Sequence, residues 1–122
     1  MKTFYRFLNF ALLHTLLLMA INFGAQGIEG ARNVATGVIV VAGLIMIIAG
    51  FSVRAAYTVD EARAFFARRR MPQFVVVVVF VAELTNLCWN GWWVLFSIWL
   101  MAGVAIAYRE TELKKMAEAP AA

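Results

Sequence analysis

Apolar side chains along the chain gather into four long runs, and short polar segments separate them. A helix that crosses a membrane needs about 20 mainly apolar residues, with a range near 17–25. The first two runs have this length and the last two are somewhat shorter. The pattern predicts an all-α fold, a single transmembrane domain over residues 1–122 with four spans at about 4–23, 34–53, 74–89 and 92–108.

The last two runs adjoin each other, so they could form one long helix or two shorter ones. Together they cover 35 residues, 74–108. A straight helix of that length would measure roughly 52 Å, against about 30 Å for the hydrocarbon core of a bilayer. Asn90-Gly91 is a strong turn pair, and it is flanked by aromatic residues typical of a membrane–water interface, Trp89, Trp92 and Trp93. We therefore predict a helical hairpin at Asn90-Gly91. One long kinked helix, which gives three spans, is the alternative.

The basic residues favour four spans. With both termini inside, ten of the eleven Lys and Arg residues lie on the inner side, and Arg32 alone lies outside. This distribution satisfies the positive-inside rule, whereas three spans would carry the basic residues of the tail, 109–122, across the membrane. We expect an integral protein of an inner membrane, encoded by a bacterium or a phage, with both termini cytoplasmic.

Composition supports a membrane protein and argues against several other classes of protein. Hydrophobic residues make up 64% of the 122 residues and charged residues 15%. A soluble domain this small would leave much of that apolar surface in water. The single cysteine excludes a disulfide-stapled scaffold. The net charge of +4 follows from the topology of the loops, so nucleic acid is not an expected partner.

The inner loop between the second and third runs carries a helix-start motif. Thr58 and Glu61 have the spacing of a capping box, and Ala62, Phe65 and Phe66 share an apolar face. We predict a short amphipathic helix over 58–70 at the cytoplasmic interface. Its basic side chains would meet anionic lipid headgroups; they are Arg63, Arg68, Arg69 and Arg70. A basic loop that only sets topology is the alternative.

Motifs for catalysis, metals and cofactors are missing from the sequence. It has no Cys–His cluster with metal-ligand spacing, no glycine-rich phosphate loop and no nucleophile elbow. His14 is the only histidine and Cys88 the only cysteine, and the two lie at different depths of their runs. We therefore expect no enzyme activity, no metal and no cofactor.

Small residues recur every seven positions in the second run, at Ala35, Thr36, Ala42, Gly43, Ala49 and Gly50. Small residues let two helix backbones approach closely inside a bilayer. This stripe should therefore face another helix, either within the subunit or in an oligomer. A pore-lining helix and ordinary close packing are both compatible with it.

A few polar residues remain inside the predicted membrane. Glu83 is followed at helical spacing by Asn86 and Asn90, and the first run holds His14, Thr15 and Asn22. His14 lies about 15 Å, and Glu83 about 13–14 Å, from the inner end of its own run. The matching depths predict that His14 and Glu83 approach each other or share a polar cavity. Their role could be a structural hydrogen bond, a proton or cation site on a transport path, or an oligomer contact.

Two function classes follow, and the sequence favours the first, with the second as the alternative. The first is a small oligomeric membrane protein that forms or gates a path for ions or small solutes, as a channel, a transporter or a holin-like pore. Phage holins are short, very hydrophobic chains, and the charged segment from Arg109 to Lys115 resembles their tails in general pattern. Small multidrug-resistance transporters also have four spans, but their embedded glutamate lies in the first span, where this chain has His14. The second class is a non-transporting interaction protein: an immunity or exclusion protein, a sensor or an assembly subunit. In either class we expect a homo-oligomer or a subunit of a larger membrane complex.

Overall fold

The computed structural model describes residues 2–68 and 71–120, which fold almost entirely into helices. In chain order the helices are α1 (Lys2–Ala25), α2 (Glu29–Phe51), α3 (Val53–Ala56), α4 (Val59–Ala67), α5 (Gln73–Trp89) and α6 (Trp93–Ala117). The all-α prediction is confirmed.

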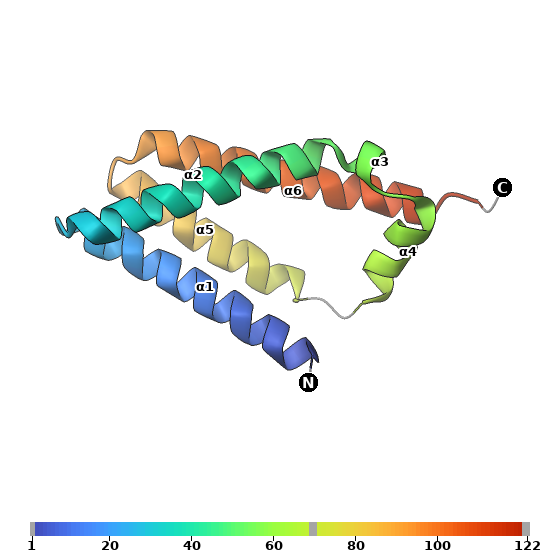
Figure 1. Cartoon of the computed structure of the whole chain (residues 1–122), viewed down its shortest axis with the longest axis horizontal. Helices are drawn as coiled ribbons and strands as arrows, with labels where there is room; N and C mark the ends of the chain where they lie inside the picture. Colours follow the sequence, from blue (N-terminus) through green and yellow to red (C-terminus); the bar gives the residue numbers. More distant parts are fainter. Residues whose placement is uncertain (1, 69–70, 121–122) are drawn as a thin grey trace.

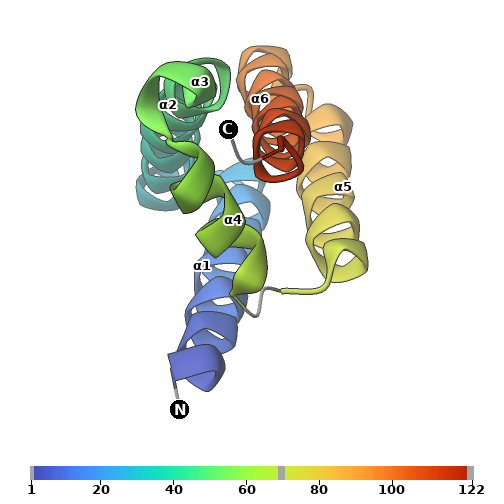
Figure 2. The same ribbon diagram turned by 90° about the vertical axis from the view of Figure 1, so that its right-hand side faces the viewer.

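The four longest helices form a bundle that opens toward one end (Figure 1). The α1–α2 and α5–α6 turns lie together at the narrow end. From there, α1 and α5 diverge from α2 and α6, as Figures 1 and 2 both show. Both ends of the chain and α4 lie toward the wide end. α4 and both termini therefore lie toward a common end of the bundle.

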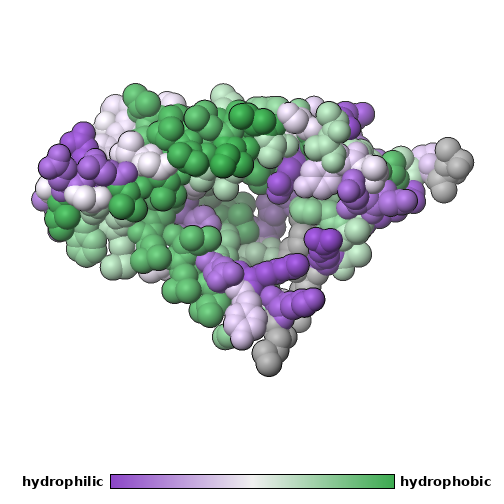
Figure 3. Space-filling view, in the orientation of Figure 1, coloured by the Kyte–Doolittle hydropathy of each residue, from purple (hydrophilic) through white to green (hydrophobic). Residues whose placement is uncertain are grey.

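Three described helices are long and apolar enough to cross a membrane: α1, α2 and α6. This fits an integral membrane protein. α5 is a shorter apolar helix of 17 residues. Apolar side chains also cover the middle of the face drawn in Figure 3, while hydrophilic ones gather at the α1–α2 turn and around α4.

α2 starts at Glu29, five residues before the predicted start of the second span at residue 34. The first turn of α2 is polar, and Glu29 in it interacts favourably with the positive end of the helix dipole. α1 and α2 come together closely at this end, since a Cβ on Gly24 would lie 2.8 Å from Arg32 Cα. Gly27 makes the turn with a φ of +94°. The connection between the two helices therefore has three residues, 26–28.

The third and fourth runs form two separate helices, as the Asn90-Gly91 pair predicts. Gly91 has a φ of +71°, a left-handed conformation that glycine adopts without a steric penalty. Trp92 N donates a 2.9 Å hydrogen bond to Leu87 O across the turn. A single kinked helix over 74–108 is therefore wrong for this structure.

The small-residue stripe of α2 packs against α6 within the subunit. Ala35, Gly43 and Gly50 are buried, Thr36 and Ala42 are half-buried, and Ala49 is exposed. A Cβ on Gly50 would lie 2.4 Å from Ala105 O, and one on Gly43 would lie 2.7 Å from Ile98 Cγ2. The stripe therefore allows close contact between these two backbones, which is the close-packing interpretation.

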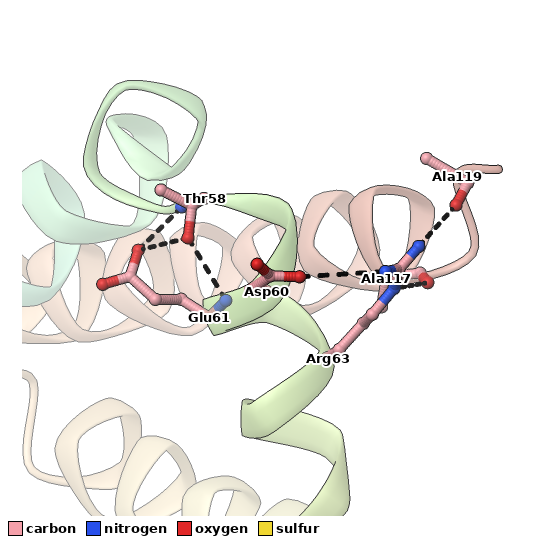
Figure 4. A network of polar contacts seen from close by, with 6 residues as sticks. All are labelled: Thr58, Asp60, Glu61, Arg63, Ala117 and Ala119. Atoms are coloured by element: carbon pink, nitrogen blue, oxygen red, sulfur yellow. Dashed lines mark hydrogen bonds and ion pairs between the residues drawn. The ribbon is translucent and has the colours of Figure 1, made fainter. Parts of the chain in front are cut away.

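α4 starts where the sequence predicts and ends early. Thr58 Oγ1 accepts a hydrogen bond from Glu61 N, and the Glu61 carboxylate accepts one from Thr58 N at 2.7 Å, so the capping box is present (Figure 4). The helix ends at Ala67, and Arg68 has extended backbone geometry. The expectation of a helix over 58–70 is thus wrong at Arg68, and Arg69 and Arg70 lie outside the described residues.

The apolar face of α4 packs on protein. Ala62 is buried with Val53 and Leu113, and Phe65 and Phe66 pack against this cluster. Arg63 donates hydrogen bonds to Ala119 O at 2.9 Å and Ala117 O at 3.3 Å, and its guanidinium lies 3.8 Å from Asp60 (Figure 4). Arg63 thus holds the end of α6, where the helix dipole favours a cation. Headgroup binding by Arg63 and Arg68 stays a prediction.

Candidate functional site

The site is centred on Glu83, a carboxylic acid with no exposed surface. Glu83 shares a face of α5 with Phe80, one turn before it, and Leu87, one turn after it. Leu87 is also fully buried, and Phe80 packs against the same core. The apolar face that holds α5 against the bundle therefore carries this carboxyl group inside, where it needs hydrogen-bonding partners.

Both carboxyl oxygens of Glu83 have a partner. Oε1 is hydrogen-bonded to Nδ1 of His14 on α1. Oε2 accepts a 2.8 Å hydrogen bond from the indole N–H of Trp99 on α6. We call His14, Glu83 and Trp99 the polar triad. It joins three helices at a single point, and the predicted approach of His14 and Glu83 is confirmed.

A close fit between α5 and α6 positions Trp99. Gly103, one turn further along α6, faces the ring of Phe80, and a Cβ there would lie 2.2 Å from Phe80 Cζ. The Phe80 and Trp99 ring centroids are 6.4 Å apart. Trp99 is itself buried together with Leu95 and Ala102 on the same face of α6. This packing directs the indole toward α5.

His14 links the buried carboxyl group to a cavity. Its ring packs on Phe10, with centroids 4.3 Å apart, and its side chain stays 27% exposed. The cavity has a volume of about 330 Å³. Its lining comes from α1, α2 and α6: Leu13, His14, Leu16, Leu17, Val34, Val38, Ala42, Met46 and Trp99. We call it the His14 cavity.

The other predicted polar residues do not join the triad. Asn86 and Asn90 donate to carbonyls of their own turn, Ala82 O at 2.9 Å and Asn86 O at 2.8 Å. Asn22 likewise donates to Leu18 O at 2.8 Å, and its side chain is exposed. Thr15 is exposed on α1. The polar stripe on α5 is therefore a series of local bonds that begins at a buried acid.

The chemistry available to the polar triad is hydrogen bonding and proton sharing. Either His14 Nδ1–H donates to a Glu83 carboxylate, or a protonated Glu83 donates to Nδ1, and a proton can pass between the two. The Trp99 N–H can only donate. Among the described residues, no group of three or more His, Cys, Asp or Glu is placed to hold a metal ion.

A second polar cluster lies beyond the apolar part of α6. Glu112 is buried, accepts a 2.9 Å hydrogen bond from Lys115 Nζ, and also pairs with Arg54 Nε. These bonds to Lys115 and Arg54 hold the pKa of Glu112 below its ordinary value. Nearby, the Arg109 guanidinium lies over the Phe65 ring, 5.7 Å from its centroid. The cluster ties α3 and α4 to α6.

Trp99 and Arg54 are the site residues that the sequence analysis missed. A signal for Trp99 exists, because Glu83 and Trp99 each lie eight residues from Gly91. The two arms of a helical hairpin meet at equal distances from the turn, and a tryptophan away from the interface needs an acceptor for its N–H. Arg54 carries no such sequence signal, since its contact with Glu112 depends on how α3 packs against α6.

Comparisons with known proteins give no family for this arrangement. The chain matches no protein-family model, no curated protein and no solved structure at a significant level.

Proposed function

We propose that the chain is an integral membrane protein of four spans, with α4 and both termini in the cytoplasm. α5 would measure about 25 Å at 1.5 Å per residue, so it can cross a bilayer that thins slightly around it. The common end for α4 and the two termini supports this topology (Figure 1).

Within that topology, the proposed role is that of a non-conducting interaction protein. One observation carries this proposal: Glu83 is completely buried, and protein groups occupy both of its oxygens. An ion path needs polar groups that face water or a passing ion. Here the embedded acid faces His14 and Trp99, and the neighbouring asparagines bond to their own helix.

Such a protein acts through its outer surface. Many large apolar side chains of α1 and α2 remain exposed, among them Leu13, Leu16, Val41, Ile45 and Ile48. In a bilayer these contact lipid or the spans of another protein. An immunity or exclusion protein, a sensor and an assembly subunit of a larger complex all belong to this class, and a homo-oligomer is compatible with each.

A path for ions or small solutes is the second candidate. The position of His14 favours it, because the ring is bonded to a buried acid on one side and lines the His14 cavity on the other. A proton could travel from the cavity through His14 to Glu83. A transport role would then need a further exit from Glu83 toward either membrane surface.

Flux measurements separate the two candidates. The full chain is reconstituted in liposomes with a pH-sensitive dye inside, and proton and potassium flux are measured under a pH gradient and an imposed potential. The interaction proposal expects the leak of protein-free liposomes, for the wild type and for Glu83→Gln alike. A flux that the wild type raises and Glu83→Gln abolishes would establish the transport class instead.

A further inference from the structure

The His14 cavity has the character of a small-molecule site. Its volume of about 330 Å³ falls within the range of roughly 300–1,000 Å³ for ligand pockets in proteins. Such pockets are mainly apolar, with few polar groups that orient the ligand. Among the described residues that line this one, the non-aromatic side chains are all aliphatic or Met, and the indole N–H of Trp99 is already bonded to Glu83.

His14 supplies the remaining polar group. Nδ1 is engaged by Glu83, while no described residue bonds Nε2. The ring is fixed by two contacts, the bond to Glu83 and the packing on Phe10. A histidine held in this way through one nitrogen presents the other in a defined orientation. The polar triad thus prepares one hydrogen-bonding position in an otherwise apolar cavity.

The depth of His14 in the membrane limits which class of molecule can bind in the His14 cavity. In the proposed topology His14 lies about 15 Å from Phe4, where the apolar run of α1 begins, and so near the middle of a hydrocarbon core of about 30 Å. A phospholipid tail at this depth presents only methylene groups, because its polar part stays at the interface. An ion would meet an apolar wall and lose its hydration. A neutral, mainly apolar molecule with one hydrogen-bonding group can pack against the apolar lining and also bond to Nε2.

We infer that the His14 cavity binds a small neutral hydrophobic molecule that carries one hydrogen-bonding group, such as a hydroxyl or a carbonyl, which meets His14 Nε2. At roughly 30 Å³ for each water-sized group, the cavity accommodates about ten non-hydrogen atoms. The inference goes beyond the proposed function, since a conducting bundle and a non-conducting bundle could both hold this site.

The test uses the full chain in nanodiscs with nitrogen-15 in histidine. Because His14 is the only histidine, every ring signal reports on this residue. The probes are naphthol and naphthalene, planar molecules of nearly equal size that differ by one hydroxyl. Naphthol is expected to shift the Nε2 resonance in a saturable way. Naphthalene is expected to shift it at least tenfold less at equal concentration in the lipid.

Two variants locate the binding. Ala42→Leu and Val38→Phe each fill the cavity from α2, and both should abolish the naphthol shift while the ligand-free Nδ1 resonance stays as in the wild type. Ala49→Leu changes an exposed small residue of the same helix outside the cavity and should bind normally. The unshifted Nδ1 signal shows that a variant has kept its fold.

Three results would overturn the inference. They are a naphthol shift that does not saturate, an equal shift with naphthalene, and an undiminished shift in both Ala42→Leu and Val38→Phe. None of them bears on proton or potassium flux in liposomes, so the failure of this inference is distinguishable from the failure of the proposed function.

Discussion

The indole N–H of Trp99 donates a 2.8 Å hydrogen bond to Oε2 of Glu83, across the two arms of the α5–α6 hairpin. The donor and the acceptor lie on helices separated by the Asn90-Gly91 turn, and both side chains are buried. This bond leaves the other oxygen of Glu83 for His14 on α1. The geometry makes Glu83 the meeting point of α1, α5 and α6.

Loss of the Trp99 donor should destabilise the bundle. Trp99→Phe keeps an aromatic ring but leaves one oxygen of Glu83 without a partner. The free energy of unfolding in mixed detergent micelles should fall by about 0.6–2 kcal/mol, the range of hydrogen bonds inside membrane proteins. Trp89→Phe is the matched control, because Trp89 is 88% exposed. Equal stability of the two variants would contradict the role given to Trp99.

Two replacements of Glu83 should separate what its side-chain volume contributes to stability from what its hydrogen bonds contribute. Glu83→Gln keeps a carbonyl oxygen for Trp99 and should cost about 1 kcal/mol or less. Glu83→Ala leaves the Trp99 N–H unpaired and opens a cavity, so it should cost about 2–5 kcal/mol. Thermal unfolding in a mild detergent measures both. Equal stability of Glu83→Ala and Glu83→Gln would contradict the pairing of the Trp99 N–H with Glu83.

The α2–α6 contact should be sensitive to size at Gly50 and indifferent at Gly37. A Cβ on Gly50 would lie 2.4 Å from Ala105 O, whereas one on Gly37 would meet nothing within 4 Å. Gly50→Leu should therefore cost on the order of 1–3 kcal/mol through overpacking. Gly37→Leu should leave stability the same or raise it, since glycine is a poor helix former. Unfolding of the two variants in one detergent series gives the comparison.

The stability of the first turn of α4 should fall as the pH is lowered. Thr58 donates its backbone N–H and its hydroxyl to the Glu61 carboxylate, which lowers the pKa of Glu61 below the ordinary 4.5. A lowered pKa means that the folded helix favours the ionised form. Its stabilising contribution is therefore complete at neutral pH and is lost as the pH falls below 4.5 through the lowered value.

The Thr58 amide proton resonance follows this titration directly. Its midpoint should lie below 4.5 in the wild type and move toward 4.5 in Thr58→Val, which lacks the hydroxyl. A wild-type midpoint at or above 4.5 would contradict the capping geometry.

Glu112 should control how firmly α3 docks on α6. Glu112→Gln weakens the pairs with Arg54 on α3 and Lys115 on α6, and both of these cations are well exposed. Such pairs are worth about 0.2–1 kcal/mol, so amide exchange in α3 should rise roughly two- to fivefold. Glu118→Gln, at an exposed position, is the control. Unchanged exchange in Glu112→Gln would remove the proposed tie.

The sequence predicts the fold well where its signals are local. The apolar runs predict the four longest helices, Asn90-Gly91 predicts the turn, and Thr58 with Glu61 predicts the start of α4. Helix ends are less predictable. Glu29 lies in a polar stretch and still begins α2, and the arginine run is basic enough to suggest a last helical turn that α4 does not contain.

The candidate site is predictable from the sequence only in part, because some of its residues carry a positional signal and others depend on tertiary packing. Equal depth along two helices predicts that His14 and Glu83 can meet, and they do. Trp99 could be found only by counting from the turn on both arms. The contacts of Arg63 and Arg54 with α6 depend on tertiary packing, which no local pattern records.

The central claim is that Glu83 is enclosed by protein groups and has no access to water. Hydrogen–deuterium exchange of the four indole N–H groups, followed by NMR in nanodiscs, tests this claim most directly. Trp99 should stay protected long after Trp89 and Trp93 have exchanged, since its N–H is buried against Glu83 and theirs flank the turn. If Trp99 exchanges as fast as Trp89, water reaches the carboxyl group, and the claim of an enclosed, non-conducting site is contradicted.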